Sequence, residues 1–227
     1  MKVKLVSYSQ PSTDFLNEGL ENVQDLIAYA ARVSNPSNQF NTETSTKLLN
    51  YLAKHKHWSP FEMVSACLEI ETTRDIARQI LRHRSFSFQE FSQRYADPTQ
   101  DLDFELREAR LQDDKNRQNS VELDIKNNEE HARIFVEWNE KQEGVIQASK
   151  DAYAWAIKNG IAKEQARAVL PEGNTVSRMY MNGTIRSWIH YIELRAANGT
   201  QLEHMEIAKE VARAITEVFP LAEDYIS

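Results

Sequence analysis

Apolar residues recur at helical spacing through most of this chain and alternate along only two short stretches. Alternation marks residues 1–8 and 63–72 as strands. The helical pattern, with Gly144 as a candidate break in the longest helix, covers residues 22–33, 45–54, 75–82, 129–158, 162–169, 185–195 and 202–218, and Thr184 is a candidate cap for the helix at 185–195. Neither a strand–helix–strand repeat nor a G-x-G-x-x-G motif supports a dinucleotide-binding Rossmann unit. The sequence therefore predicts a mostly helical fold with two or more strands.

The length and composition predict one soluble domain. The 227 residues contain no Gly/Pro/Ser-rich linker, so we expect a single domain over residues 1–227. Mean hydropathy is −0.61, and no stretch reaches the roughly 18 to 20 apolar residues that a membrane span needs. The first eight residues lack the apolar core of a secretory signal. We therefore expect a cytoplasmic protein that does not contact membranes.

The single cysteine, Cys67, excludes an intramolecular disulfide and a multi-cysteine zinc site. This composition fits a reducing compartment. Strand alternation places Cys67 with Ser65 and Glu69 on the less apolar face, which favours a passive structural role.

Residues 97–128 are charged and irregular, with several aspartates and glutamates. They carry no helical or strand periodicity and separate two periodic regions. We expect an acidic surface excursion of variable sequence here rather than an interdomain linker.

A cationic cluster lies at residues 82–94, R-H-R-S-F-S-F-Q-E-F-S-Q-R, in a chain whose formal net charge is −7. Local cations in an acidic protein favour a small anionic ligand such as phosphate, because a polynucleotide track biases a whole surface toward positive charge. Gln79, Arg82 and His83 share a face at helical spacing. The alternative is a solvated helix end whose cations interact with the macrodipole.

The end of this segment carries donors for a phosphate monoester. Ser92, Gln93 and Arg94 offer a hydroxyl, an amide and a guanidinium fork. The neighbouring phenylalanines and Tyr95 pack the segment or, alternatively, stack on the bases of single-stranded nucleic acid. The acidic balance of the chain favours the small-ligand hypothesis.

A second polar cluster lies at Arg186, His190 and Arg195. The first two are four residues apart and share a helix face, whereas Arg195 lies roughly 180° from Arg186 around the helix. One helix then serves two pockets, as in an active site shared between subunits, or else it carries ordinary surface charges. His55 and His57 with a nearby glutamate also resemble a metal site, but a fixed third ligand is missing, so we predict no metal.

The signature at residues 82–94 is similar to that of the flavin-dependent thymidylate synthases: R-H-R, two residues, Ser, four residues, Ser, one residue, Arg. Residues 54–62 resemble the H-x-[ST]-P-F-E loop of this family, residues 166–171 its A-R-x-x-L-P turn, and residues 184–195 the helix that ends at its active arginine. The resemblance covers roughly residues 1–96 and 160–219. Residues 196–207 depart from the family, because many relatives have a histidine near Gly199.

The resemblance implies an α+β homotetramer with a small, mainly antiparallel sheet, known as the thymidylate synthase-complementing fold. It implies reductive methylation of dUMP to dTMP with FAD, 5,10-methylenetetrahydrofolate as carbon donor and NADPH as reductant. The positions matching the family's dUMP site are Gln79, Arg82, Glu90, Ser92, Gln93, Arg94, Arg167 and Arg195. Those matching the FAD site are Ser59, Arg82, His83, Arg84, Glu90, Thr184, Arg186 and His190. On the folate or nicotinamide side they are His57 and Tyr95.

Carbon 5 of uracil is a weak nucleophile, so the ring needs electron density. Other thymidylate synthases add a cysteine thiolate, but Cys67 lies outside every matched motif. We therefore predict that the Arg195 cation stabilises an enolate-like ring, and that Ser92, without an adjacent general base, binds substrate. The alternatives are a nucleotide- or RNA-binding module built on the arginines and a flavoprotein that has lost turnover. The intact arginines argue against the second.

Overall fold

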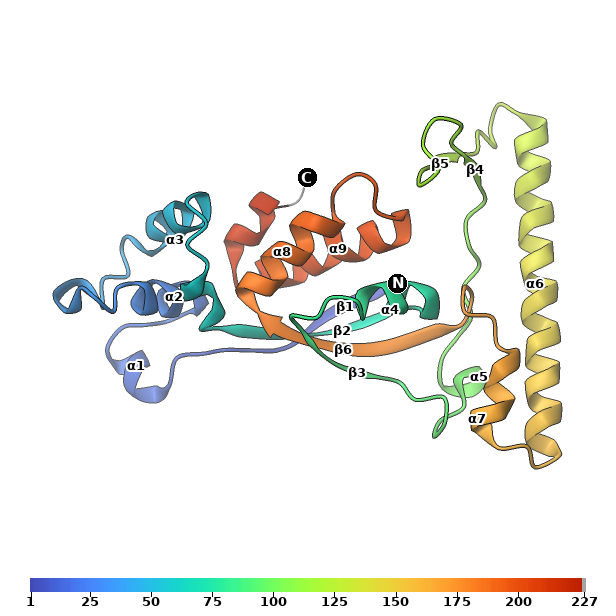
Figure 1. The fold of residues 1–227 in the computed structure, drawn as a ribbon, viewed down its shortest axis with the longest axis horizontal. Coiled ribbons are helices and arrows are strands. Elements are labelled where there is room, and N and C mark those ends of the chain that lie inside the picture. Colours follow the sequence, from blue (N-terminus) through green and yellow to red (C-terminus); the bar gives the residue numbers. More distant parts are fainter. Residues whose placement is uncertain (226–227) are drawn as a thin grey trace.

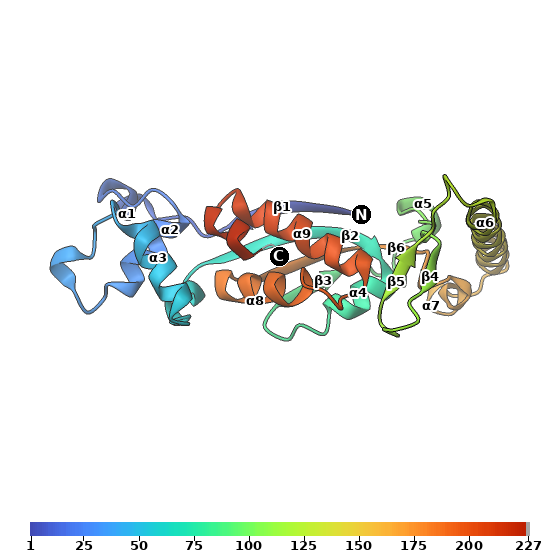
Figure 2. The ribbon, with the colours of Figure 1, turned by 90° about the horizontal axis from the view of Figure 1, so that it is seen from above.

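The molecule is elongated, with a small sheet at its centre and helices at both ends (Figure 1). The structure, a computed structural model, describes residues 1–225. Helices α8 (Ile185–Arg195) and α9 (Leu202–Thr216) lie over one face of the sheet, as Figures 1 and 2 both show. Helices α1 (Thr13–Asn17), α2 (Val23–Ala31) and α3 (Ser45–Lys54) occupy one end and α6 (Glu129–Lys158) stands at the other.

The sheet has four antiparallel strands in the order β1–β2–β6–β3. Their bounds are β1 (Lys2–Tyr8), β2 (Ser65–Thr73), β6 (Val176–Thr184) and β3 (Ser87–Glu90). The predicted mainly antiparallel sheet is confirmed. The sequence revealed neither β6 nor β3, because both strands are fixed by pairing with distant partners: Met181 pairs with Leu68 of β2 on one side and with Phe88 of β3 on the other.

The two faces of the sheet differ in polarity. Leu68, Ile70, Met179 and Met181 are fully buried under the helices. The opposite face carries a polar ladder in which the Tyr180 hydroxyl donates to Glu69 over 2.8 Å and Arg178 binds Glu71. Cys67 lies on this polar face, as alternation predicted, and burial raises the pKa of its thiol.

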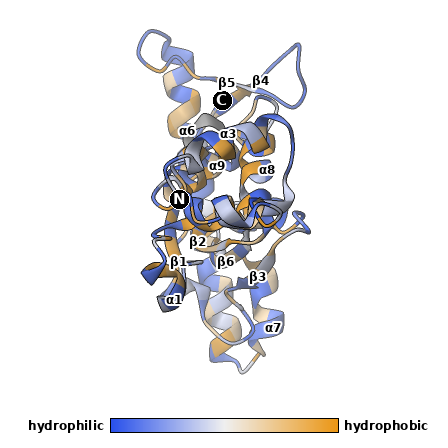
Figure 3. Ribbon diagram, turned by 90° about the vertical axis from the view of Figure 1, so that its left-hand side faces the viewer, coloured by the Kyte–Doolittle hydropathy of each residue, from blue (hydrophilic) through white to orange (hydrophobic). Residues whose placement is uncertain are grey.

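The main core lies between the sheet and helices α8 and α9. Both helices carry many apolar residues, which are orange in Figure 3. Trp188, Ile189 and Ile192 of α8 pack with Ile207 and Ile215 of α9, all at 1% exposure or less. Each such side chain contributes roughly 1.5 to 3 kcal/mol through burial. This packing fixes the position of α8, on which Arg186, His190 and Arg195 are carried.

Helix boundaries follow local capping signals where these exist. The side chain of Thr184 accepts a hydrogen bond from the Ser187 backbone N–H and starts α8 at the predicted residue, and Asn22 caps α2 in the same way. Helix α4 (Arg74–Ile80) ends two residues earlier than predicted. Arg82 and His83 therefore lie in the turn after the helix, and the prediction that they share a helix face with Gln79 was wrong.

Helix α6 runs without a break through Gly144, so the predicted interruption was wrong. Gly144 is surrounded by open space, and a single glycine in a helix costs only about 1 kcal/mol relative to alanine. Asn128 caps the helix start by accepting from the N–H groups of Glu130 and His131. A second small core joins α6 to the short helix α7 (Lys163–Ala166) through Tyr153, Ala156, Ala166 and Leu170.

The acidic excursion at residues 97–128 contains secondary structure, although its sequence shows no helical or strand periodicity. Its residues form α5 (Pro98–Asp101) and a hairpin of β4 (Arg110–Gln112) and β5 (Ser120–Glu122). The backbone of Arg107 anchors them to α6, because its N–H donates to Gln142 over 2.7 Å and its carbonyl accepts from Trp138 over 2.9 Å. None of the helices within residues 1–225 combines the length and apolar composition of a membrane span.

Candidate active site

Arg195 lies in the last turn of α8 and donates from Nε to Nε2 of His83 over 2.9 Å. His83 accepts this bond, so the nitrogen involved carries no proton. Burial, and then the adjacent Arg195 cation, lower the pKa of His83 from 6.5 to about 4. A neutral imidazole therefore positions a permanent guanidinium at neutral pH, and the terminal nitrogens of the guanidinium remain for a ligand.

Behind this pair lies a buried histidine that the sequence prediction missed. His204 of α9 is 0% exposed, with Nε2 3.1 Å from the Tyr191 hydroxyl and Nδ1 3.2 Å from Oε1 of Gln79. Burial, followed by the charge of Arg195 and by His83, lowers the pKa of His204 to about 3. The available signal was its place on the apolar face of α9, three and four residues before Ile207 and Ala208.

The predicted phosphate-binding residues gather where the signature meets α7. Arg94 forms an ion pair with Glu164 over 3.3 Å, and Nε of Arg167 donates to the carbonyl of Glu164, also over 3.3 Å. Gln93 is 3% exposed, and its Nε2 is buried with no hydrogen-bond partner within residues 1–225. An unpaired buried donor is costly, so a ligand atom that accepts from Gln93 would stabilise this loop. Ser92 lies beside them, with its Oγ 3.4 Å from the Arg94 N–H.

Glu90, at the end of β3, is already engaged by neighbours. Its carboxylate accepts from Arg78 over 3.0 Å and from the Ser177 hydroxyl over 2.8 Å, and Arg74 lies 3.7 Å away. These contacts join β3 to α4 and β6. Glu90 therefore anchors the middle of the signature.

Four of the eight predicted flavin-side residues group around α8 and the turn Ser59–Glu62, namely Ser59, Thr184, Arg186 and His190, whereas the other four lie in the signature segment. Arg186 forms an ion pair with Glu62 over 2.5 Å, and the His190 ring lies 4.8 Å from that of Trp58. His190 and Trp58 line a cavity of ≈ 430 Å³ together with Asn50, Ala53, Lys54, Lys56 and Glu193. Thr184 caps α8, Ser59 begins the turn, and exposed His57 lies 6.4 Å from the Tyr51 ring.

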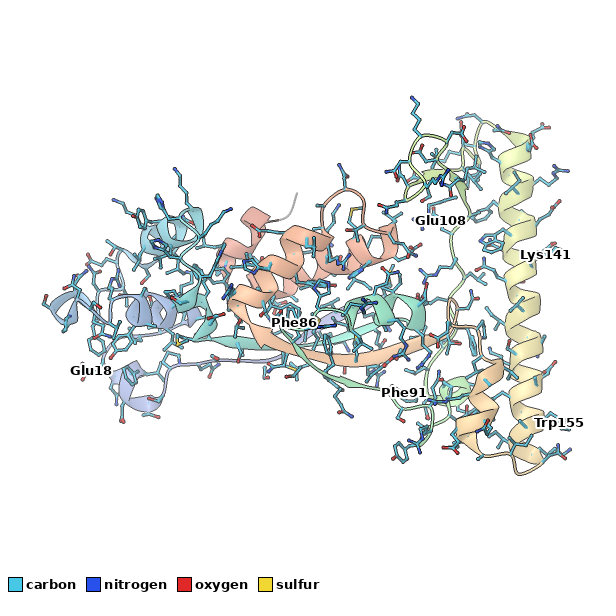
Figure 4. The ribbon with its side chains drawn as sticks, in the orientation of Figure 1. Glu18, Phe86, Phe91, Glu108, Lys141 and Trp155 are labelled. Carbon is cyan, nitrogen blue, oxygen red and sulfur yellow. The ribbon has the colours of Figure 1, made fainter. Side chains whose placement is uncertain are left out.

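Phe86 anchors the first half of the signature beneath α8 (Figure 4). Its ring lies 4.6 Å from Trp188, and the Ser187 hydroxyl donates to the Ser85 carbonyl over 3.3 Å. A Cβ on Gly183 of β6 would approach Phe86 to 2.4 Å, so the ring occupies the space that this glycine leaves. The flanking Arg82 and Arg84 are exposed, and Tyr95 is 80% exposed.

One copy of the chain does not bring all predicted site residues together. Within residues 1–225, no hydrogen bond or ion pair joins the group of Arg94 and Arg167 to Arg195. Arg186 contacts the turn before β2, whereas Arg195 contacts the turn after α4, in agreement with their opposite positions on α8. No cluster of three or more His, Cys, Asp or Glu side chains in the described part of the chain has the geometry to bind a metal ion.

Comparison with known proteins identifies the family. Residues 4–221 match the family described as "Thymidylate synthase complementing protein". The "Probable flavin-dependent thymidylate synthase" of Paramecium bursaria Chlorella virus 1 is 47% identical over 220 residues, which cover 97% of this chain and 96% of the relative. The "Flavin-dependent thymidylate synthase" of Synechocystis sp. is 48% identical over 221 residues, with coverage of 97% and 96%. The Thermus thermophilus enzyme of the same name is 32% identical over 196 residues, 86% of this chain and 68% of the relative.

A crystal structure shares the fold. It is that of a "UMP/dUMP methylase PolB" from Streptomyces cacaoi bound with 5-Br dUMP, with a TM-score of 0.75 and 23% identity. The match covers 99% of this chain and 93% of the other. The chain belongs to the flavin-dependent thymidylate synthase family. The predictions of this family, of a methyltransferase with thymidylate synthase function and of the α+β fold are therefore confirmed.

Proposed function

We propose that the chain methylates dUMP to dTMP, with FAD as cofactor, 5,10-methylenetetrahydrofolate as carbon donor and NADPH as reductant. The observation that carries the proposal is the Arg195–His83 pair, a guanidinium whose Nε is fixed by a neutral imidazole 2.9 Å away. Gln79 lies close to this pair, because Oε1 of Gln79 bonds to His204 and the His204 ring lies beside those of His83 and Tyr191. A cation and an amide thus converge where a pyrimidine edge needs polarisation.

Arg195 is the catalytic residue in this proposal. The terminal nitrogens of its guanidinium face the carbonyl edge of uracil and stabilise the negative charge that develops as carbon 5 becomes nucleophilic. A guanidinium keeps its charge at every physiological pH, so it needs no proton transfer to act. Cys67 takes no part, because it lies on the polar face of the sheet away from α8.

The phosphate of dUMP binds at the other group. Arg94 and Arg167 supply guanidinium donors and Ser92 a hydroxyl, while Gln93 supplies the buried amide nitrogen that has no partner among the described residues. Binding phosphate there replaces the contact of Arg94 with Glu164 by a stronger charge-assisted one. Arg82 and Glu90 complete the nucleotide site.

The residues on the flavin side fit FAD by their chemistry. Arg84 and Arg186 are cations for a pyrophosphate, Ser59 and Thr184 provide hydroxyls, and His83 and His190 provide imidazoles for a ring system. Bound FAD supplies the hydride chemistry that no side chain provides. These side chains bind and orient the cofactor, and the Trp58 and His190 rings exclude water from its surroundings. We assign His57 and Tyr95 to the folate or nicotinamide side.

We further propose a homotetramer of single-domain chains, 1–227, in which different copies complete each active site. The separation of the Arg94 and Arg167 group from Arg195, and the different neighbours of Arg186 and Arg195, support this arrangement. The single cysteine supports a reducing, cytoplasmic location. We propose no nucleic-acid or membrane partner, and the net charge of −7 supports the absence of the former. Sedimentation velocity tests the oligomer: a monomer that makes dTMP would refute the shared site.

The deciding experiment is the visible absorption spectrum of the purified protein. We expect a flavin spectrum that NADPH bleaches anaerobically, followed by dTMP in the chromatogram only when dUMP and methylenetetrahydrofolate are both present. A colourless protein that neither takes up added FAD nor makes dTMP would refute the proposal and leave the arginines as a phosphate-binding surface. In that case binding to RNA, with its steep salt dependence, would be measured next.

A further inference from the structure

A continuous chain of polar side chains runs from Tyr191 in the core to the hairpin excursion. His204 lies 3.1 Å from the Tyr191 hydroxyl and 3.2 Å from Oε1 of Gln79. Nε2 of Gln79 donates to Oε1 of Gln201 over 2.8 Å, and Nε2 of Gln201 donates to Glu203 over 2.9 Å. The resemblance assigned Gln79 to the nucleotide and gave no role to the other four residues.

Glu203 ends this series of hydrogen bonds, and it is the one member whose role as acceptor is fixed. It is 8% exposed and bound by Arg110, with Arg107 at 3.5 Å. Burial alone would raise the pKa of this carboxyl, but the hydrogen bonds from its own N–H and Gln201, with the charges of Arg107 and Arg110, lower it overall. Glu203 is thus an ionised group that only accepts hydrogen bonds.

The direction in which Gln79, Gln201 and His204 donate and accept is not fixed by these three side chains themselves. Both glutamines can rotate by 180° and the histidine can change tautomer, so the chain from Tyr191 to Gln201 is satisfied in either direction. If the hydrogen bonds run in the reverse direction, however, the Gln201 carbonyl faces the Glu203 carboxylate, and these two acceptors repel each other. Glu203 therefore fixes the Gln201 amide, which fixes the Gln79 amide.

We infer that Glu203, acting through Gln201, is a positioning residue that makes the Gln79 amide select a uracil over a cytosine nucleotide. The inference rests on the proposed function, since it places the base of dUMP at Gln79. The fixed amide has one free Nε2 hydrogen and one free Oε1 lone pair. Uracil offers a carbonyl oxygen at position 4 and an N–H at position 3, which match these groups, whereas cytosine offers an amino group and an acceptor, the opposite pattern.

The excursion thereby gains a role. Arg110 belongs to β4 and Arg107 precedes it, and both come from residues 97–128. Arg107 also binds Asp75 at the start of α4, the helix that carries Gln79. These arginines compensate the buried charge of Glu203, without which a carboxylate in this position would be protonated and would lose its polarity.

The test compares calorimetric dissociation constants of dUMP and dCMP for the FAD-loaded protein and for three variants. Glu203→Gln keeps the shape of the side chain but allows the hydrogen bonds to run in the reverse direction. Gln201→Met interrupts the series of hydrogen bonds at an exposed residue and leaves the buried ion pair of Glu203 with Arg110 intact. Gln147→Met is the matched control, because Gln147 is an exposed glutamine on α6 whose Nε2 donates to Asp151 on the same helix.

We expect the ratio of the dCMP to the dUMP constant to fall roughly tenfold or more in Glu203→Gln and Gln201→Met, the factor that one hydrogen bond contributes. The control should keep the wild-type ratio. If Glu203→Gln does not fold, Gln201→Met decides alone, because it leaves the core unchanged.

A purely structural role for Glu203 predicts a lower melting temperature in Glu203→Gln and no change in either ratio. An unchanged ratio in a folded Gln201→Met variant would overturn the inference and leave the proposed function standing. A wild-type protein that binds FAD but neither nucleotide would overturn the proposed function and this inference with it.

Discussion

Acid should destabilise this fold through the two histidines beside Arg195. Burial and the Arg195 cation lower the pKa of His83 to about 4 and that of His204 to about 3, from an ordinary value of 6.5. In the unfolded chain both rings bind a proton below pH 6.5, whereas in the folded chain both remain neutral. Their contribution to stability is therefore fully present above pH 6.5 and is lost as the pH falls toward the folded values.

The size of the effect follows from proton uptake. Between pH 7 and pH 5 an unfolded imidazole gains most of a proton, and keeping the buried ring neutral over this range costs about 2 kcal/mol. This figure applies to His204, which is 0% exposed. His83 is partly exposed, so solvent screening reduces its share to roughly 1 kcal/mol. Together they lower the free energy of unfolding by roughly 3 kcal/mol at pH 5.

Urea unfolding at pH 7 and pH 5 measures this loss in the wild type and in His204→Gln. The variant removes the titrating ring and leaves a neutral amide, so its loss between the two pH values should be smaller by about 2 kcal/mol. His55→Gln, at an exposed histidine after α3, is the matched control and should respond like the wild type. Equal losses in the wild type and His204→Gln would refute the assignment of a buried neutral histidine.

Three further predictions concern single residues. Arg195→Ala should keep its FAD absorbance but lower kcat roughly 100-fold or more in a dTMP assay, and near-normal turnover would remove Arg195 from the catalytic role. Cys67→Ser should retain kcat within about twofold, since no thiolate adduct is needed, and a dead but folded variant would contradict this. Gly183→Ala should cost about 1 to 3 kcal/mol in urea unfolding, because its Cβ would overlap Phe86, and wild-type stability would show that the ring moves freely.

The sequence alone determined the features that depend on local patterns. Helix α3 begins and ends where its leucine spacing predicted, and α8 begins at its Thr184 cap. Strand β2 was found by its alternation within two residues of its start. The thirteen-residue signature and the arginine at the end of α8 gave the family, because spacing within a motif is itself a sequence property.

Tertiary structure decided what depends on distant partners. Strand β6 was invisible in the sequence and is stable through its pairing with β2 and β3. The predicted break at Gly144 was absent because a single glycine costs less than packing α6 against its neighbours gains. The proximity of His83 to Arg195, 112 positions apart, is likewise a product of the fold.

The polar chain from Tyr191 to Glu203 shows the same limit for the site. The sequence shows a histidine on an apolar helix face and three arginines in an acidic excursion, but neither pattern identifies the hydrogen-bond partners of these residues. Burial removes water as a hydrogen-bond partner, so each of these groups must find another in the chain, and only the packing of α9 against α4 and the excursion determines which. The residue types come from the sequence, and their pairing comes from the fold.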